Sequence, residues 1–448
     1  MSNFRMRVRI RSLAMAISVG AMLSAAPAMA KDVVRFLHNE TDPPSIEFYN
    51  KAIAAFEAEN PDIEIQMEAV GTDARLQKVV AALSAKTMPE IFKILPEEIP
   101  DFAKKGYIEN LDSFIDDIGR DDFVKGSVAT IDGKAFSVPY TLGNFSVLFY
   151  RDDLLKAKNI EVPKNWDDLK SAAAKLTGDG KYGFIFPAGK NRMTSIFLSA
   201  LMWSAGGTYF DKDLNVTFDN PGTIKALQFL KDMVPYSPPG IASYSYNDMI
   251  NAYMTGTVAL DIYASRLPAN AAANTPDLFA NTKPAPMPAG PAGLAVEYVS
   301  PDSFALTTPA AGAKSPEAAR KFLKYIITGS RLKDFSLTAF PHLIAPLKSV
   351  QPDLIKEGSA MLNNRTEFGE QAFSMPNSLD FDTEAGATFE GGKVTMSGIR
   401  NPYIGPIVAR DIPAVVVQRV VLQGEDPAAA AAWGAEQMKQ LVEDAKSK

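Results

Sequence analysis

The stretch VVRFLHNETDPPSIEFYNKAIAAFEAENPDIEIQMEA, residues 33–69, carries the pattern that decides the fold. An apolar run over residues 33–37 ends in a polar loop over residues 38–42, and two prolines follow, which suit the first turn of a helix. Apolar residues then recur every three or four positions, which predicts a helix with one apolar face. Over residues 63–69 apolar and polar residues alternate, as in a strand with one covered face. Strand, helix and strand in this order indicate an α/β lobe with a largely parallel sheet.

The same alternation resumes later in the chain and predicts a second lobe from about residue 145. Residues 146–150 have the composition of a strand, Asn165 is placed to cap a helix that ends near residue 176, and a further strand is expected over residues 182–186. Residues 268–293 are dense in Pro, Ala, Gly and Asn, and we expect a connection there. Two domains also agree with a length of 448 residues, because single cores stop growing at roughly 250–300 residues.

The first thirty residues predict a cleavable secretory signal peptide. Four arginines precede an apolar stretch over residues 13–23, and Ala28-Met29-Ala30 is a small-x-small cleavage site. The alternative is a membrane anchor, but the apolar stretch is interrupted and falls short of the roughly 20 residues that a spanning helix needs. Without a cysteine there is no site for a lipid anchor. We expect the mature protein, from residue 31, to be soluble and exported.

Composition excludes several kinds of chemistry. Removing residues 1–30 takes away four arginines and no acidic residue, so the net charge moves from −6 to −10, which disfavours nucleic acid and anionic lipid as partners. The chain has no cysteine, hence no disulfide or thiolate metal site, and its two histidines, His38 and His342, cannot form a histidine-rich zinc site. We therefore predict no catalytic residue, no metal and no cofactor.

A series of short motifs, spread in order over almost the whole mature chain, resembles extracellular solute-binding proteins of family 1, the maltose-binding-like receptors of ABC importers. The motifs are FEAENPDI (56–63), PEI (89–91), GYIENL (106–111), GKAFSVPY (133–140), LFYRDDL (148–154), NWDDL (165–169), GKYGF (180–184), GG (206–207), FDNP (218–221), MTGTVAL (254–260), SPEAA (315–319) and LQGEDP (422–427).

The resemblance implies a two-lobed periplasmic-binding-protein fold of the class II type, in which each lobe has a mixed, mostly parallel sheet flanked by helices. The chain would cross between the lobes three times, near residues 142–145, 284–288 and 334–340. The N-terminal lobe would comprise residues 31–142 and 288–335, and the C-terminal lobe residues 143–287 and 336–448. Ligand would bind in the crevice between the lobes, at the carboxyl ends of strands, and the lobes would close by a hinge motion.

Candidate ligand contacts in the N-terminal lobe are His38, Asn39, Glu40 and Thr41, because they follow the first strand and precede a helix N-terminus. An ordinary polar loop with a capping role is the alternative. Glu97 stands at the spacing from residues 89–91 where family members place a polar ligand residue, and a solvated acid is the alternative there.

Candidates in the rest of the chain are an amide, two glycines and four aromatic residues. Asn144 lies at the first predicted crossing, and an amide can both donate to and accept from sugar hydroxyls. Gly206 and Gly207 let a ligand approach the backbone, or simply form a tight turn. Aromatic rings stack on the apolar faces of sugars, although a buried aromatic is more often part of a core. The aromatic candidates are Trp203, Tyr263, Tyr298 and Tyr403.

The sequence departs from the family at residues 264–266. Many sugar-binding relatives have a Gly-x-Trp here whose ring stacks on the ligand, whereas this chain has Ala264-Ser265-Arg266. A guanidinium in that place suits a carboxylate, sulfonate or phosphate on the ligand, and Arg400 is a second such donor. Pairing of both arginines with acidic residues of the protein is the alternative.

The function implied by the resemblance is that of a non-enzymatic receptor in a Gram-negative periplasm. It would capture a sugar, an oligosaccharide or an acidic sugar derivative and deliver it to the permease subunits of an ABC importer, acting as a monomer. One alternative is an exported hydrolase or lyase on the same scaffold, although no carboxylate pair suited to that role is identifiable. Another is a receptor for a polyol, a polyamine or ferric ion, with Tyr244 and Tyr246 as the nearest approach to a tyrosine cluster.

Overall fold

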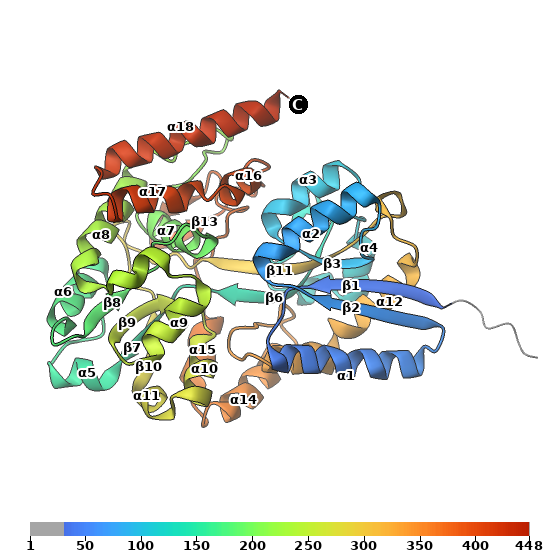
Figure 1. Ribbon diagram of the computed structural model, residues 1–448, viewed down its shortest axis with the longest axis horizontal. Helices are drawn as coiled ribbons and strands as arrows, with labels where there is room; N and C mark the ends of the chain where they lie inside the picture. The colour runs from blue at the N-terminus through green and yellow to red at the C-terminus, as the bar shows by residue number, and fades with distance from the viewer. Residues whose placement is uncertain (1–30, 448) are drawn as a thin grey trace, which may run out of the picture.

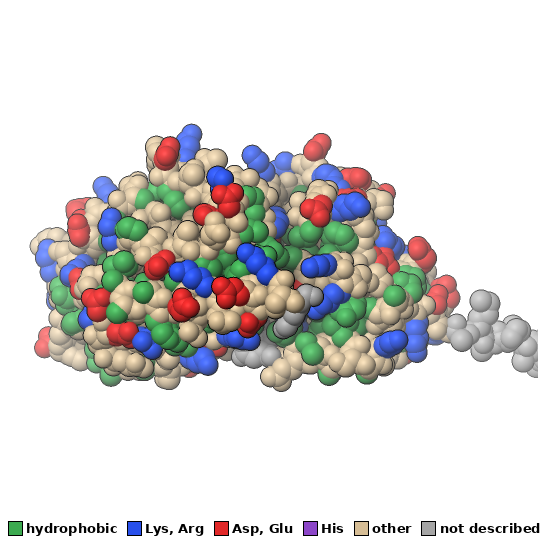
Figure 2. Space-filling model, turned by 90° about the horizontal axis from the view of Figure 1, so that it is seen from above, with side chains coloured by type: hydrophobic (Ala, Val, Ile, Leu, Met, Phe, Trp, Pro, Cys, Tyr) green, Lys and Arg blue, Asp and Glu red, His purple; other side chains and the backbone are tan. Residues whose placement is uncertain are grey.

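The computed structural model describes residues 31–447, and these fold into two α/β lobes that lie side by side along the long axis (Figure 1). The predicted signal peptide, residues 1–30, lies outside the described residues. Across residues 31–447, each helix is too short or too polar to cross a membrane. Seen from above, Lys and Arg side chains are interspersed with Asp and Glu over both lobes (Figure 2).

The N-terminal lobe is built on a five-stranded sheet with the order β2-β1-β3-β11-β6. Strands β1 and β2 pair in parallel, β1 and β3 pair in parallel, and β11 runs antiparallel to both of its neighbours. Its strands are β1 (Asp32–His38), β2 (Ile63–Ala69), β3 (Ile91–Ile94), β6 (Val138–Asn144) and β11 (Val299–Leu306). The predicted order of strand, helix and strand over residues 33–69 is confirmed.

Helices cover both faces of this sheet. The first, α1, begins at the two prolines as predicted, and Tyr49 and Phe56 on its buried face pack against the sheet core. In Figure 1, α1 lies on one side of the sheet, and α2 and α3 lie on the other. The helices of this lobe are α1 (Pro43–Glu59), α2 (Thr72–Ala85), α3 (Ile99–Lys104), α4 (Asp112–Ile118), α12 (Pro316–Ile326) and α13 (Gly329–Leu337), with short 3-10 turns η1 (Pro96–Glu98) and η2 (Arg120–Asp122).

The C-terminal lobe is built on a four-stranded sheet with the order β10-β7-β9-β8. Here β8 and β9 are parallel, whereas β7 is antiparallel to both β9 and β10, so this sheet is mixed and less parallel than the first. The strands are β7 (Val147–Arg151), β8 (Tyr182–Ile185), β9 (Val258–Tyr263) and β10 (Thr282–Pro286).

The helices of the C-terminal lobe surround this sheet, with α17 and α18 packed over α7 and α8 (Figure 1). The predicted helix after residue 165 is α6, and Asn165 caps it by accepting a hydrogen bond from the Asp168 amide at 2.9 Å. The helices are α5 (Asp152–Ala157), α6 (Trp166–Leu176), α7 (Arg192–Ser204), α8 (Pro221–Met233), α9 (Tyr246–Met254), α10 (Leu267–Asn274), α11 (Pro276–Asn281), α15 (Thr366–Phe373), α16 (Ile404–Ala409), α17 (Ile412–Val421) and α18 (Pro427–Lys446); α14 (Gln351–Met361) joins the lobes.

Smaller elements complete the chain. They are β4 (Thr130–Ile131), β5 (Lys134–Ala135), β12 (Thr388–Glu390) and β13 (Lys393–Thr395), with the 3-10 turns η3 (Val234–Tyr236), η4 (Pro239–Ser243) and η5 (Pro309–Ala311).

The prediction of a connection over residues 268–293 is wrong. The segment forms α10, α11 and the strand β10, which pairs with β7 over its whole length. Pro268 and Pro276 stand in the first turns of the two helices, where the missing N–H is tolerated. Pro284 and Pro286 belong to a strand at the edge of its sheet, where a strand tolerates proline. The prolines of this segment therefore stand at the starts of two helices and in an edge strand.

Two of the three predicted crossings lie too early in the chain. The first passage between the sheets lies between Asn144, where β6 ends, and Val147, where β7 begins in the other sheet. After β10, however, Ala289 donates to the Lys164 carbonyl at 2.9 Å and Val296 donates to Ser204 Oγ at 2.9 Å, so the chain stays with the C-terminal lobe until β11. The predicted boundary at residue 288 therefore moves to about residue 298.

The third crossing is also later than residues 334–340. Ile344 forms a β-bridge with Leu142 of the N-terminal sheet, and Lys348 donates to the Asp122 carbonyl at 2.8 Å. The chain then passes through α14 to α15, which packs against β10. The predicted boundary at residue 335 therefore moves to about residue 350, because backbone hydrogen bonds without any periodic side-chain pattern hold this segment.

The segment that leads to the second crossing contains a buried carboxyl group, Glu297. It is 7% exposed, and its Oε2 accepts a hydrogen bond from the Asn377 amide at 3.1 Å. Burial raises the pKa of Glu297 from 4.5 to about 7, against the opposing effect of this backbone hydrogen bond. Folding therefore favours the protonated form of this side chain.

We expect Glu297 to make the protein less stable as the pH rises. Because its folded-state pKa is raised, the favourable contribution is present below about pH 4.5 and is lost as the pH rises through about 7. The difference between the two pKa values corresponds to about 3 kcal/mol. Glu297→Gln keeps the acceptor for Asn377 and should flatten the decline in melting temperature between pH 5 and pH 8. Glu390→Gln, on the exposed strand β12, is the control and should retain the wild-type profile.

Candidate functional site

A cavity of about 450 Å³ lies between the lobes, and both lobes line it. This volume falls within the range of roughly 300–1,000 Å³ that is usual for small-molecule sites. The residues around it are Asn39, Glu40, Thr41, Asp42, Gly71, Lys93, Leu95, Thr141, Gly143, Ser300, Asp302, His342 and Leu343 from the N-terminal lobe, and Phe145, Asn191, Arg192, Met193, Ile196, Ser245, Tyr246, Asn247, Arg266 and Asn270 from the C-terminal lobe.

The loop between β1 and α1 supplies one wall of the cavity. The Glu40 amide donates to His38 Nδ1 at 3.2 Å, which turns the chain toward the cavity directly after the strand. The Glu40 carboxylate accepts a hydrogen bond from the Tyr140 hydroxyl at 3.0 Å, and the residue is buried. Burial raises the pKa of Glu40, and the charges of Lys93 and Arg266 oppose that effect.

Neighbouring strands of the N-terminal sheet supply a second pair of charges. Lys93 on β3 and Asp302 on β11 lie 2.8 Å apart, measured from Nζ to Oδ2, and the Lys93 side chain is 3% exposed. Since β3 and β11 pair directly, their backbone hydrogen bonds fix the position of both groups. The pair offers a donor and an acceptor to a ligand at the floor of the cavity.

Two helices of the C-terminal lobe begin at the opposite wall. Asn191 caps α7 by accepting a hydrogen bond from the Thr194 amide at 3.2 Å, and Arg192 follows it. Ser245 begins α9 with a capping box that includes Asp248, and Tyr246 is its first helical residue. Helix N-termini present amide N–H groups and partial positive charge, which suit an oxygen-rich ligand.

Aromatic rings from different segments meet at one side of the cavity. Phe145 lies edge-to-face with His342 at 5.7 Å and with Tyr246 at 6.4 Å between ring centroids. The Tyr246 hydroxyl and His342 Nε2 are 3.4 Å apart. Tyr263 holds Tyr246 in place by donating to its backbone carbonyl at 2.5 Å. Burial raises the pKa of Tyr246 to about 12 and lowers that of His342, so both rings are neutral at pH 7.

Ion pairs cross the cavity from one lobe to the other. Arg266, which follows β9, pairs with Asp42 at 2.5 Å and lies 3.8 Å from the Glu40 carboxylate. Arg192 pairs with Glu97 of η1 and donates to the Tyr298 hydroxyl at 3.3 Å. In each case the arginine belongs to the C-terminal lobe and the acid to the N-terminal lobe, so these pairs exist only while the lobes are close together.

The structure brings four of the sequence-predicted residues to the cavity: Asn39, Glu40, Thr41 and Arg266. Four others stand directly behind it and position residues that line it. His38 accepts from the Glu40 amide, Tyr263 supports Tyr246, and Glu97 and Tyr298 both contact Arg192.

The remaining predicted residues lie outside the cavity lining, and their side chains contact other parts of the protein. Asn144 uses its side chain on the backbone, donating to the Ala372 carbonyl at 3.1 Å and accepting from the Ser146 amide at 2.9 Å. Trp203 is fully buried, and its ring stacks on Tyr298 at 5.8 Å between centroids. Both side chains serve the packing near the first and second crossings.

The glycine pair and the late loop are also structural. Gly206 has a φ of +82° in the turn after α7, and a Cβ on Gly207 would lie 2.3 Å from Asn220 Oδ1. The turn thus needs glycine for its conformation and for close packing against the cap of α8. Arg400 pairs with Asp382 at 2.7 Å, and Tyr403 is half-buried against Phe210. These residues come together with the core of the C-terminal lobe.

Several residues that line the cavity are not among the predicted carbohydrate contacts, such as Lys93, Phe145, Arg192, Tyr246 and Asp302. A signal existed for two of them. Arg192 follows the cap residue Asn191, and Tyr246 follows Ser245 with an acid three positions later, so both stand at recognisable helix starts. Lys93 and Asp302 have no such signal, because their meeting depends on the pairing of strands distant in sequence.

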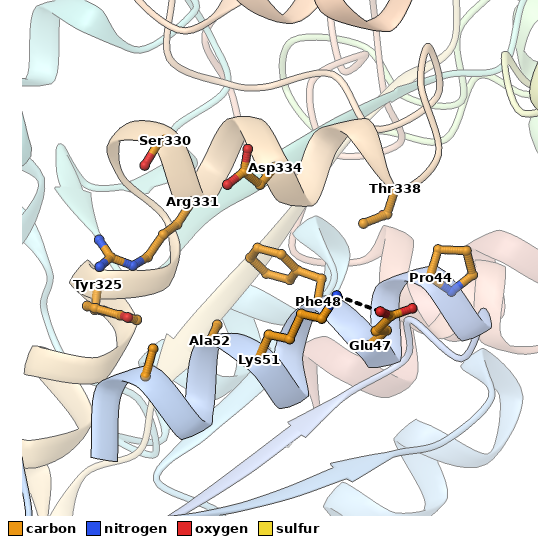
Figure 3. Close-up of a pocket in the computed structure, with 11 residues that line it drawn as sticks. Pro44, Glu47, Phe48, Lys51, Ala52, Tyr325, Ser330, Arg331, Asp334 and Thr338 are labelled. Carbon is orange, nitrogen blue, oxygen red and sulfur yellow. Dashed lines mark hydrogen bonds and ion pairs between the residues drawn. The ribbon is translucent and has the colours of Figure 1, made fainter. Parts of the chain in front are cut away.

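A second cavity, of about 580 Å³, lies on the outer surface of the N-terminal lobe and is separate from the inter-lobe cavity. Figure 3 shows that α1 and α13 form its walls, with Phe48 between them and Glu47 paired to Lys51. The Arg331 guanidinium lies over the Tyr325 ring at 3.5 Å from its centroid. Its lining comes from one lobe, so closure of the two lobes does not enclose it.

Comparison with known proteins agrees with this architecture. The family model of the bacterial extracellular solute-binding proteins matches residues 42–328. A binding protein of Brucella abortus (strain 2308) is 31% identical over 317 residues, which cover 69% of this chain and 75% of that protein.

Two solved structures share the two-lobed fold. The ABC transporter solute-binding protein of Agrobacterium radiobacter K84, in complex with ribitol, has a TM-score of 0.74 at 20% identity and covers 92% of this chain and 99% of its own. Maltose-bound MalE3 of T. maritima has a TM-score of 0.73 at 20% identity and covers 91% of this chain and 99% of its own.

The pair between Arg192 and Glu97 should hold the lobes together. Their side chains are 24% and 6% exposed, so Glu97→Gln would leave a largely buried arginine without its charged partner. We expect a loss of about 1–3 kcal/mol in the free energy of unfolding and, by small-angle scattering, a larger radius of gyration.

Asp101→Asn is the control for this prediction, because it removes the exposed pair of Asp101 with Lys105 on nearby α3. It should leave both measurements unchanged. If the radius of gyration of the Glu97→Gln protein equals that of the wild type, this pair does not hold the lobes together.

Proposed function

The chain belongs to the bacterial extracellular solute-binding proteins, and we propose that it captures a small carbohydrate or polyol between its lobes and delivers it to the permease of an ABC importer. The observation that carries the choice of ligand is the combination of groups in the inter-lobe cavity. Charged donors and acceptors stand on its floor and walls, amides and hydroxyls stand at the helix starts, and aromatic rings stand at one side.

This combination matches the chemistry of a polyhydroxylated solute. Each sugar or polyol hydroxyl both donates and accepts, so it bonds best where donors and acceptors alternate, as they do at Lys93 and Asp302. The C–H faces of the same molecule are apolar and pack against rings such as Phe145 and Tyr246. The two ligands named for the structural neighbours, ribitol and maltose, are of these classes.

The size of the cavity favours a ligand of one or two sugar rings, or a polyol. Its volume of about 450 Å³ is in the lower half of the usual range of roughly 300–1,000 Å³. A long oligosaccharide would have to leave part of its length outside the cavity.

Capture requires that the closed arrangement bind the ligand better than the open one. Residues of the N-terminal lobe such as Glu40 and Asp302, and of the C-terminal lobe such as Tyr246 and Asn270, can touch one ligand together when the lobes are close. The three connecting segments act as the hinge, which is the usual device for closure of two domains around a ligand. The solute itself then stabilises the closed form that the permease receives.

We also propose where the protein works and how it treats its ligand. Residues 1–30 act as a signal peptide that is removed on export, and the mature protein diffuses freely in a Gram-negative periplasm as a monomer. It releases its ligand chemically unchanged, which separates it from an exported hydrolase or lyase. A tyrosine cluster for ferric ion is disfavoured, because Tyr246 lines the cavity and Tyr244 does not.

A thermal-shift screen tests the ligand class. Neutral sugars and polyols should raise the melting temperature by a few degrees, because a ligand present at 100 times its Kd adds about 2.7 kcal/mol to the stability of the native state. Polyamines and ferric ion, tested in parallel, should not. Mass spectrometry of a positive ligand after incubation should show it intact, and a hydrolysed or eliminated product would contradict the transport role.

Removal of an aromatic ring from the cavity should weaken binding of whichever neutral ligand the screen finds. We expect Phe145→Ala to raise the Kd about tenfold in calorimetry, which corresponds to the loss of about 1.4 kcal/mol of packing. Tyr403→Ala is the matched control, since it removes a half-buried ring that lies outside the cavity lining. Equal Kd values for the two variants would show that Phe145 does not contact the ligand.

A further inference from the structure

Each cationic side chain that lines the inter-lobe cavity already has a carboxylate partner within the protein. The pairs are Lys93 with Asp302 at 2.8 Å, Arg192 with Glu97, and Arg266 with Asp42 at 2.5 Å. The positive and negative charges of the cavity lining therefore nearly cancel. Among the described residues of the lining, every cation would have to leave its carboxylate partner in order to bind an anionic ligand.

Arg266 lines the cavity and has two acidic side chains of the other lobe beside it. Its guanidinium contacts Asp42 through Nη1 and lies 3.8 Å from the Glu40 carboxylate through Nη2. The Arg266 side chain is 12% exposed and that of Glu40 8% exposed, so water screens their interaction weakly. The hydroxyl of Tyr140 fixes the Glu40 carboxylate at 3.0 Å.

An anionic ligand would therefore meet two obstacles at this position. A carboxylate or phosphate binds arginine through the planar fork of N–H groups, and Asp42 already holds part of that fork. The negative charge of the ligand would also lie in the cavity that Glu40, Asp42 and Asp302 line, and these acids would repel it. A neutral hydroxyl meets neither obstacle, since it can share these groups without displacing a charge.

The arrangement of the lobes adds a further cost for an anion. Arg266 follows β9 in the C-terminal lobe, whereas Glu40 and Asp42 lie between β1 and α1 in the N-terminal lobe. An anion that took Arg266 from these acids would break a contact that joins the closed lobes. A neutral solute leaves that contact in place and so benefits from it.

We propose that Asp42 and Glu40 are specificity-determining residues, which occupy Arg266 and so restrict the cleft to uncharged polyhydroxylated solutes. This inference rests on the proposed function, since it assumes that the inter-lobe cavity binds a carbohydrate or polyol. An arginine in a binding cavity suggests an anionic ligand. Here Arg266 instead pairs with carboxylates of the other lobe and so stabilises the closed arrangement.

Matched pairs of neutral and acidic probes test the inference. The pairs are glucose with glucuronate, galactose with galacturonate, sorbitol with gluconate, and lactitol with lactobionate, measured by calorimetry on the full-length mature protein at low ionic strength. The wild type should bind the neutral member of at least one pair, and should bind its acidic counterpart about tenfold more weakly or worse. Asp42→Asn should narrow that gap by about tenfold, and Asp42→Asn combined with Glu40→Gln should narrow it further.

Asp213→Asn is the control variant, because it removes one negative charge from an exposed turn, where Asp213 pairs with Lys212. It should leave the preference unchanged, which separates a local effect from one of net charge. Asp42 has a side chain that is 48% exposed, so Asp42→Asn should fold normally, and its melting temperature without ligand checks this. If the substitution of buried Glu40 impairs folding, the Asp42→Asn variant is sufficient to test the inference.

The possible outcomes separate this inference from the proposed function. Wild-type protein that binds an acidic probe as tightly as its neutral counterpart would overturn the inference and leave the proposed function standing. The inference would also be overturned if the wild type prefers the neutral probe but Asp42→Asn binds the acidic probe no more tightly than the wild type does. If the wild type binds no member of any pair, the proposed function fails and the inference fails with it.

Discussion

Pairing of arginines from one lobe with carboxylates of the other is the interaction on which the inter-lobe cavity depends. Arg266 meets Asp42 and Glu40 on one side, and Arg192 meets Glu97 on the other. A charge taken out of water is costly unless it is paired and hydrogen-bonded, so each arginine favours the arrangement in which its acid is near. Because the two partners belong to different lobes, this requirement also fixes how the lobes face each other. A glycine at the same contact, Gly405 of α16, lets its helix lie against η1, since a Cβ there would be 2.7 Å from the Glu97 carbonyl oxygen.

The polar groups of the cavity have their positions because secondary-structure ends converge there. Strands β1 and β3 run in parallel and bring their carboxyl ends to one edge of the sheet, where the loop after His38 and the short turn η1 begin. Helices α7 and α9 start at the opposite wall, and their caps expose Arg192 and Tyr246. Strand ends and helix starts leave backbone groups unpaired, so this edge is polar before any side chain is considered, and an apolar solute would find few partners in it.

The periodic parts of the fold could be predicted from the sequence, and the non-periodic parts could not. The segments around β1, α1, β2 and α6 follow local rules of alternation, helical spacing and capping, and the structure confirms them. The late crossings were missed because contacts such as that of Ile344 with Leu142 join backbone groups far apart in sequence and leave no pattern in side chains. In the site, the loop that holds Asn39, Glu40 and Thr41 lines the cavity, whereas Trp203 and Tyr403, chosen by residue type alone, lie outside that lining. The local sequence does not indicate which way an aromatic ring faces, and the rings of Trp203 and Tyr403 pack within the protein.

The residues predicted as contacts but found behind the cavity still bear on specificity. Of these residues, His38, Tyr263 and Tyr298 are buried, and so is Tyr140, which was not predicted as a contact. Each of the four makes a hydrogen bond to a residue that lines the cavity. A lining side chain held in this way has fewer accessible rotamers, so it presents one geometry to a ligand instead of adapting to several. Glu40 shows the consequence most clearly. Its Oε1 is fixed by Tyr140 while its Oε2 faces Arg266, so the carboxylate cannot turn away to admit a competing anion without leaving a buried hydroxyl unpaired. Selection for neutral solutes thus follows from the rigidity of the layer behind the cavity as much as from the charges that line it.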